Sequence, residues 1–164
     1  MRHRLSGNDF VALLSGGLDS YVAVKMAAPK MKFRLAITFD YGQRTAKKEI
    51  DTAARIASEF KAEHKIIEIG WMRDETRTAL VDLQKKIPAT DAMRVDAKAA
   101  KNAAAVWVPN RNGVFISIAA AFAEARGIGS VITGFNAEEA KTFPDNSEKF
   151  IKASNLALSM STMS

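Results

Sequence analysis

The chain has 164 residues with 48% hydrophobic content, which suits one globular domain with a buried core. It contains no cysteine, no run of 18 apolar residues and no signal-peptide core, so we expect neither disulfides nor thiolate zinc sites nor a membrane segment, and we place it in the cytoplasm. The net charge of +6 comes from 24 lysines and arginines spread along the chain, and this charge alone does not separate a nucleic-acid partner from a small anion.

Strand-like and helix-like segments alternate along the first part of the chain. An apolar strand is predicted over residues 10–14 and a helix over 21–28, followed by a β-branched strand over 33–39. The clearest helical pattern covers residues 46–64, where apolar side chains repeat on one face. A third strand is predicted over 65–69.

The pattern weakens between residues 71 and 106, where charges and alanines mix and Pro88 interrupts. We expect a mobile lid or loop there, with 96–105 as either a short helix or an exposed loop. A helix is predicted over 112–125, a strand over 130–133 and a last helix over 147–160. The alternation predicts an α/β fold for residues 1–164: a doubly wound parallel sheet with helices on both faces.

The loop between the first strand and the first helix is the strongest functional signal. It consists of Ser15, Gly16, Gly17, Leu18, Asp19 and Ser20. Two glycines allow a tight turn that brings bare N–H groups against an anion, and the N-terminus of the following helix adds its positive dipole end. An ordinary strand-to-helix turn is the alternative. The loop is not a Walker loop, because G-x-x-x-x-G-K-[ST] does not occur; it resembles the S-G-G-x-D-S loop of the N-type ATP pyrophosphatases.

Three further loops follow predicted strands or precede a predicted helix. Ligands of open α/β sheets bind beyond the carboxyl ends of the strands, so we expect these loops to line one crevice with the phosphate loop. They are Asp40-Tyr41-Gly42-Gln43-Arg44, Val108-Pro109-Asn110-Arg111-Asn112, and Gly134-Phe135-Asn136 with Phe143-Pro144-Asp145-Asn146.

Three charged residues are candidates for handling phosphate and metal. Asp19 suits Mg²⁺, which prefers oxygen ligands, although aspartate is equally a favoured helix cap. Arg111 can pair with a phosphate or a carboxylate through its planar fork, or form a structural salt bridge. Arg44 lies either at the site or on the surface, if Asp40-Tyr41-Gly42 is only a turn.

Aromatic and acidic side chains are candidates for the organic part of a ligand. Tyr41 or Phe135 can stack on a purine-like ring, and each is otherwise a core residue. Asp145 can accept hydrogen bonds from a ring N–H, or serve in a turn. His3 lies near the terminus and His64 at a predicted helix end, and neither is predicted to be catalytic.

Five segments occur in one order and together resemble a known family. S-G-G-x-D-S, F-D-Y-G-Q-R, V-P-x-R-N, I-T-G and F-P-D, between Phe10 and Leu158, are similar to the 7-cyano-7-deazaguanine synthase family, QueC, of queuosine and archaeosine precursor biosynthesis. The resemblance implies an adenine nucleotide alpha hydrolase-like, Rossmann-like domain. It also implies an ATP-dependent C–N ligase that uses Mg²⁺ and converts 7-carboxy-7-deazaguanine and ammonia into the nitrile.

The resemblance distributes roles over the candidate residues. It implies catalytic roles for Asp19 and Arg111, a homodimer, and no direct nucleic-acid or membrane partner. ATP contacts are expected from Ser15, Gly16, Gly17, Leu18, Asp19, Ser20, Asp40, Tyr41, Gly42, Gln43, Arg44 and Gly134. Substrate contacts are expected from Asn110, Arg111, Asn112, Phe135, Asn136, Pro144 and Asp145.

The chain departs from the family pattern in its thiols. Family members usually continue into a tail with a four-cysteine zinc site, and a cysteine commonly follows F-P-D, where this chain has Asn146. We expect a truncated form of a longer protein rather than a branch without the zinc subdomain, because a doubly wound domain that ends in a helix commonly continues into a strand. The alternatives in function are another S-G-G-x-D-S pyrophosphatase, such as an amide or tRNA-modifying ligase, and an ATP-binding module without turnover.

Overall fold

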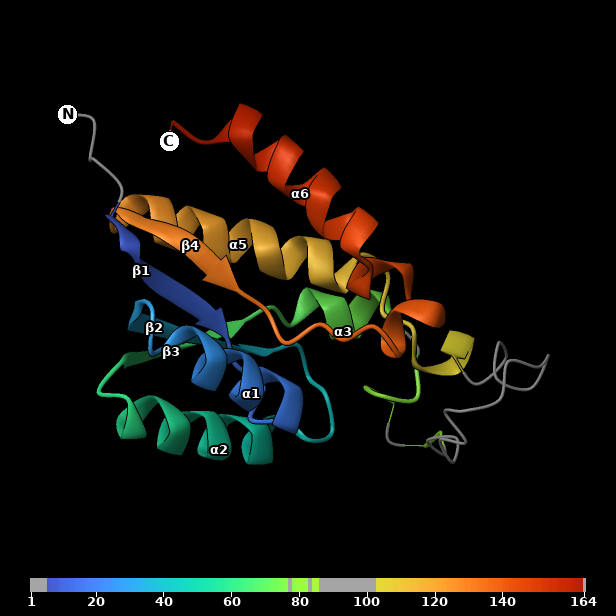
Figure 1. Cartoon of the computed structure of the whole chain (residues 1–164). Coiled ribbons are helices and arrows are strands. Elements are labelled where there is room, and N and C mark those ends of the chain that lie inside the picture. Colours follow the sequence, from blue (N-terminus) through green and yellow to red (C-terminus); the bar gives the residue numbers. More distant parts are fainter. Residues whose placement is uncertain (1–5, 77, 83, 86–102, 164) are drawn as a thin grey trace.

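Four parallel strands form one sheet in the order β3-β2-β1-β4 (Figure 1). The computed structural model describes residues 6–76, 78–82, 84–85 and 103–163. The strands are β1 (Ser6–Leu13), β2 (Lys32–Asp40), β3 (Glu63–Glu68) and β4 (Ile128–Ile132). The helices are α1 (Leu18–Ala27), α2 (Ala46–Glu59), α3 (Trp71–Glu75), α5 (Arg111–Ala125) and α6 (Glu148–Ser161), with 3-10 turns η1 (Glu139–Lys141) and η2 (Pro144–Asn146).

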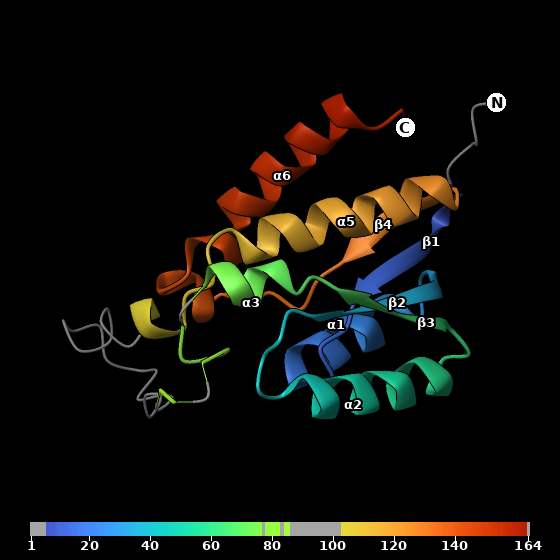
Figure 2. The same cartoon turned by 180° about the vertical axis from the view of Figure 1, so that it is seen from behind.

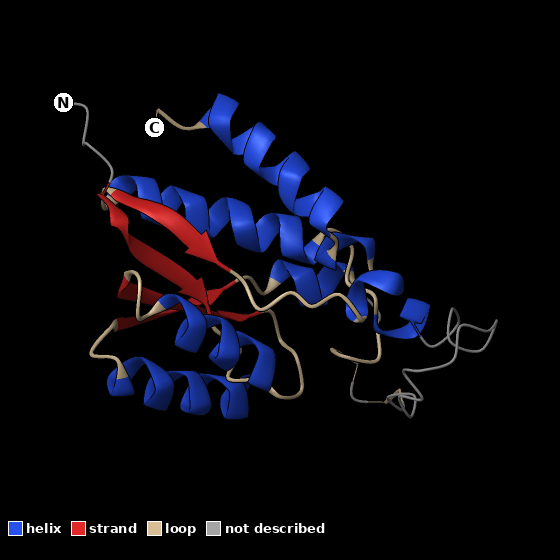
Figure 3. Ribbon diagram, viewed as in Figure 1, coloured by secondary structure: helices blue, strands red, loops and turns tan. Residues whose placement is uncertain are grey.

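The strand order reverses beside β1, as the predicted doubly wound fold requires. The chain moves outward from β1 through β2 to β3, and β4 then pairs with the other side of β1, with Val11 opposite Leu35 on one side and Val131 on the other. Helices α1 and α2 cover one face of the sheet, and α3, α5 and α6 lie on the opposite side (Figures 1, 2 and 3). A reversal of this kind opens a crevice at the carboxyl ends of β1 and β4.

Side chains along β1 and at Leu14 just after it point alternately into two separate apolar layers. Phe10, Ala12 and Leu14 pack with residues of α1 and α2, whereas Val11 packs with α3 and α5. All four side chains are buried. A strand that is apolar on both faces is the mark of a central parallel strand, and it fixes the loop that follows Leu14 between the two layers.

The predicted helix over residues 46–64 is too long. Helix α2 ends at Glu59, and Lys61 adopts a left-handed conformation with φ 54°, which stops the helix before β3 begins at Glu63. The placement of His64 at a helix end is therefore wrong. His64 lies on β3, where its Nε2 is 2.9 Å from the Thr38 hydroxyl and burial lowers its pKa.

The expected lid over residues 71–106 lies partly outside the described residues. Within the described part, Met72 and Val81 are buried in the same apolar layer as α5, Ala79 is also buried, and residues 103–106 are helical. The stretch 86–102 is not described, so the prediction of a mobile lid, including most of 96–105, stays untested.

Candidate nucleotide-binding and active site

The phosphate loop turns between β1 and α1 with a backbone that favours anions. Gly16 has φ +73°, and a Cβ added there would lie 2.7 Å from the Thr52 Cβ, so only glycine fits. Helix α1 has Gly17 as its N-cap, with no side-chain capping bond, and its first described intrahelical bond runs from Tyr21 N–H to the Gly17 carbonyl. No side-chain cap therefore occupies the N–H groups at the start of α1, and they can bind an anion.

The chain leaving β4 touches the phosphate loop at the backbone. A Cβ added to Gly134 would lie 2.6 Å from Ser20 N and 2.8 Å from the Asp19 carbonyl carbon. Two residues later, the Asn136 Nδ2 donates to Asp19 Oδ2 at 3.0 Å. The switch point therefore joins two segments that lie more than a hundred residues apart in the sequence.

Arg111 is oriented by a tyrosine from the turn after β2. It opens helix α5, and its Nη1 donates to the Tyr41 hydroxyl at 3.1 Å while the guanidinium lies 5.7 Å from the Tyr41 ring centroid. The Tyr41 ring is buried against Phe115, and burial raises the pKa of its hydroxyl. Within the described part of the chain Arg111 forms no ion pair, so the alternative of a structural salt bridge receives no support there.

Two carboxyl groups lie in the electrostatic neighbourhood of Arg111. Partial burial raises the pKa of Asp145, which the Arg111 charge opposes, and the Asn112 amide donates to the Asp145 carbonyl at 3.4 Å. Partial desolvation of the Glu139 carboxyl, followed by the nearby Asp19 charge, raises the pKa of Glu139, although much of that residue is exposed. Both acids therefore take up protons at higher pH than free side chains do.

The turn after β2 holds Tyr41 from behind. Gln43 is buried: its Oε1 accepts from Tyr41 N–H, and its Nε2 donates to the Phe39 carbonyl and the Glu49 carboxylate, each at 3.0 Å. Asp40 Oδ1 accepts from Gly42 N–H at 2.9 Å. These contacts form a turn, which was one of the two interpretations of this segment.

Arg44 points away from the crevice in this structure. Its Nη2 donates to the backbone carbonyls of Asp82 and Lys85, which ties the turn after β2 to the segment after α3. Its Nε is buried without a partner among the described atoms. The structure thus gives Arg44 an anchoring role, and its expected ATP contact stays a prediction.

A crevice of about 310 Å³ lies at the carboxyl ends of β1 and β4. Most of the phosphate loop and the Tyr41–Arg111 pair line it. The predicted residues outside its immediate wall are Gly16, Asp40, Gly42, Gln43, Arg44, Asn110, Asn136, Pro144 and Asp145. The predicted residues in the wall are Ser15, Gly17, Leu18, Asp19, Ser20, Tyr41, Arg111, Asn112, Gly134 and Phe135.

Two acidic wall residues were not predicted. Glu49 lies in the first turn of α2, and its Oε1 accepts from the Thr45 hydroxyl at 2.5 Å. Glu139 opens η1, and its backbone N–H donates to Asn136 Oδ1 at 2.8 Å. No local sequence pattern predicted either position: Glu49 reaches the crevice through the fold of the turn after β2, and Glu139 through the path of the chain after β4.

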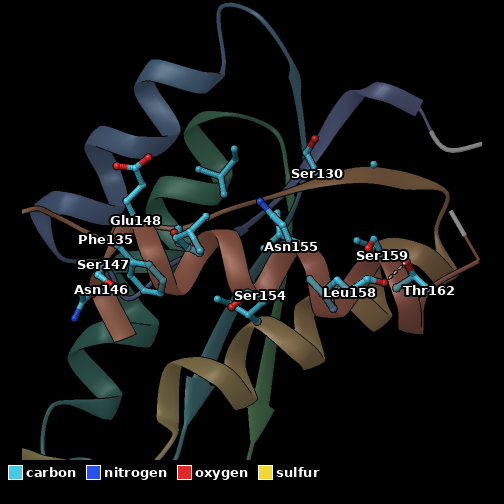
Figure 4. Close-up of a pocket in the computed structure, with 18 of the residues that line it drawn as sticks. Ser130, Phe135, Asn146, Ser147, Glu148, Ser154, Asn155, Leu158, Ser159 and Thr162 are labelled. Atoms are coloured by element: carbon cyan, nitrogen blue, oxygen red, sulfur yellow. Dashed lines mark hydrogen bonds between the residues drawn. The ribbon is translucent and has the colours of Figure 1, made fainter. Parts of the chain in front are cut away.

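A larger hollow of about 800 Å³ lies between β4, α5 and α6 (Figure 4). Its wall is mainly apolar, and it meets the smaller crevice at Thr133, Phe135 and Asn146. It contains neither the phosphate loop nor Arg111, so the predicted catalytic residues gather at the smaller crevice despite the difference in size.

The crevice suits a magnesium–nucleotide better than a metal held by protein alone. Among the described residues no three His, Asp or Glu side chains converge on one point. Mg²⁺ commonly binds through one or two carboxylates together with phosphates and water, and Asp19 at the mouth of the phosphate loop fits that pattern.

In the described part of the chain, no helix is both long and apolar enough to span a membrane.

Comparison with known proteins agrees with this architecture. The family "Queuosine biosynthesis protein QueC" matches residues 9–164. Three proteins named 7-cyano-7-deazaguanine synthase, from Pelotomaculum thermopropionicum, Bdellovibrio bacteriovorus and Methanosarcina mazei, are 48%, 46% and 43% identical to the chain. Each match covers 93% of this chain and 70%, 67% and 68% of the respective relative. The chain belongs to the QueC family of queuosine biosynthesis.

Proposed function

We propose that the chain catalyses the ATP-dependent conversion of 7-carboxy-7-deazaguanine and ammonia into 7-cyano-7-deazaguanine. The observation that carries this proposal is the pairing of two walls in one crevice. A glycine loop that opens α1 forms one wall, and Arg111, aimed by Tyr41, forms the other. The names of the relatives, 7-cyano-7-deazaguanine synthase, support the choice of substrate.

The reaction explains why both walls are needed. A carboxylate does not react with ammonia because its oxygen is a poor leaving group. That oxygen must therefore first attack a phosphorus of ATP, and the rest of the ATP molecule on the other side of that phosphorus departs as the leaving group. Ammonia then attacks the acyl carbon, the phosphorylated oxygen departs and a proton is lost, which leaves an amide. In a second activation the amide oxygen attacks another ATP phosphorus, and departure of the phosphorylated oxygen with loss of both N–H protons gives the nitrile. Both activations develop negative charge on phosphate oxygens.

The phosphate wall supplies hydrogen-bond donors before the reaction begins. We assign the N–H groups at the start of α1 and the Ser15 and Ser20 hydroxyls to the phosphates, and Asp19 to Mg²⁺, which would neutralise phosphate charge. The Ser20 hydroxyl donates its single hydrogen to the Gly17 carbonyl at 2.9 Å, so it must rotate to serve a phosphate, whereas the backbone N–H groups are already in place. Preformed donors of this kind need no rearrangement when charge develops.

The opposite wall is assigned to the deazaguanine acid. The Arg111 fork can hold the carboxylate in line with the nucleotide and then stabilise its activated form. Asp145 and Asn112 lie beside it to accept from and donate to the ring edge, and Phe135 offers an aromatic face at the junction with the larger hollow. We also place the activity in the cytoplasm, with free ammonia as nitrogen donor and a homodimer as the assembly.

Turnover of defined mixtures tests the proposal. The protein should form nitrile and consume ATP only when the acid, Mg²⁺ and an ammonium salt are all present. Arg111→Lys keeps the charge but loses the fork, and we expect turnover to fall by roughly a hundredfold. Arg126→Lys is the matched control, because Arg126 pairs with Glu63 outside the crevice. A folded preparation that consumes no ATP in the complete mixture would rule the proposal out; ATP binding without acid binding would indicate a different pyrophosphatase or a module without turnover.

A further inference from the structure

We infer that Asn136 is a positioning residue that holds Asp19 toward the magnesium–nucleotide, rather than a group that contacts the deazaguanine acid. This inference rests on the proposed function for the identity of the nucleotide. It assigns the end of β4 a role in metal handling, although the sequence pattern predicts a substrate contact there.

Both polar ends of the Asn136 amide are engaged within the protein. The Nδ2 donates to Asp19 Oδ2 at 3.0 Å, and the Oδ1 accepts from Glu139 N–H at 2.8 Å. Each bond fixes the orientation of the other, because rotating the amide by 180° would set oxygen against carboxylate and NH₂ against N–H. An amide bound at both ends is poorly placed to recognise a ligand and well placed to aim a carboxylate.

The surrounding backbone makes this link rigid. Gly134 lies so close to Ser20 and Asp19 that an added Cβ would fall within 2.8 Å of both. Asn136 also accepts a backbone bond from Ala140 N–H at 3.2 Å, which continues the turn of η1. The chain after β4 therefore reaches Asp19 as one fixed unit.

Asp19 needs such a partner because it does not cap its own helix. The N-cap of α1 is Gly17, and the structure gives α1 no side-chain capping bond, so the carboxylate is not held by the first turn. The Asn136 bond orients the carboxylate through Oδ2, and a carboxylate retains further lone pairs for a metal. Hydrogen bonds to charged groups are the strong class, and loss of this one should be measurable.

Two substitutions separate the two ends of the amide. Asn136→Ser keeps a short oxygen that can accept from Glu139 N–H, as serine does at helix starts, but it is too short to reach Asp19. Asn136→Ala loses both bonds. Asn8→Ser, exposed near the amino end of β1 and outside the wall of either hollow, is the matched control.

Calorimetric titration with MgATP, and with ATP in excess chelator, gives the readout without turnover. We expect both Asn136 variants to lose roughly tenfold in MgATP affinity, with little change for metal-free ATP or for the deazaguanine acid. In an Asp19→Ala background, Asn136→Ser should have no further effect. Excess Mg²⁺ should restore much of the binding.

The failures of the two ideas are distinguishable. Unchanged MgATP affinity in Asn136→Ser, or a selective loss of acid binding, would overturn the positioning role while nitrile formation by the unaltered protein stands. An unaltered protein that binds MgATP but makes no nitrile would remove the proposed function and leave the Asp19–Asn136 link intact. An unaltered protein that does not bind MgATP would overturn both.

Discussion

Adding one methyl group at Gly134 should damage the nucleotide site from a distance. The new Cβ would lie 2.6 Å from Ser20 N, 2.7 Å from Ser20 Cα and 2.8 Å from the Asp19 carbonyl carbon. All three atoms belong to the backbone, so no side chain can rotate aside. Ordinary contact begins at 3.4 Å, and the start of α1 must therefore retreat by about 0.8 Å. Overpacking of this kind costs roughly 1–3 kcal/mol of stability, and a misplacement near 1 Å can cost about a hundredfold in rate.

Urea unfolding and MgATP titration of Gly134→Ala measure the two effects. We expect a lower unfolding midpoint and a MgATP affinity reduced by at least tenfold, on the scale of about 1.4 kcal/mol per factor of ten. Gly70→Ala is the control, because nothing lies within 4 Å of its added Cβ and its φ is −55°. A Gly134→Ala protein that matches the unaltered protein in both measurements would refute the close approach of β4 to the phosphate loop.

Three other predictions follow from contacts around the crevice. Tyr41→Phe removes the hydroxyl that accepts from Arg111 but keeps the ring, and should lower kcat/KM roughly tenfold with little change in thermal midpoint, which steady-state kinetics and a melting curve will check. Arg44→Ala should lower the urea midpoint and leave MgATP affinity within twofold, since Arg44 holds the carbonyls of Asp82 and Lys85; a selective loss of MgATP binding would instead restore its predicted ATP contact. Burial lowers the pKa of His64 from 6.5, so the unfolded state binds a proton before the folded state does as the pH falls. The contribution of His64 to stability is therefore fully present above about pH 6.5 and declines below it. His64→Gln should flatten that decline, which urea unfolding between about pH 7.5 and 5 will measure.

The elements that the sequence predicts well are those whose signal is local. β1, α1 and the loop between them follow from an apolar run, two glycines and a helical pattern within twenty residues. The Arg111 position at the start of α5 follows in the same way. By contrast, the end of α2 depends on one left-handed residue, Lys61, for which the sequence gives no strong cue.

Contacts across the switch point could not be predicted from local patterns. Asn136 and Asp19 are 117 residues apart, and their bond exists because β4 pairs beside β1 rather than beside β3. The same topology brings Glu139 to the crevice wall. The prediction that Asn136 contacts substrate rests on its loop alone and stays a prediction, whereas its contact with Asp19 depends on the strand order.

The two edge strands of the described sheet, β3 and β4, differ in how readily they can pair with a strand of another molecule. β3 carries the charged side chains of Glu63, Lys65 and Glu68, and charges on an edge strand discourage an incoming strand. β4 consists of Ile128–Ile132 with no charged residue, and the neighbouring α6 exposes Leu156 and Met160. Edge-to-edge association in concentrated solution should therefore favour the β4 border of the described sheet over the β3 border.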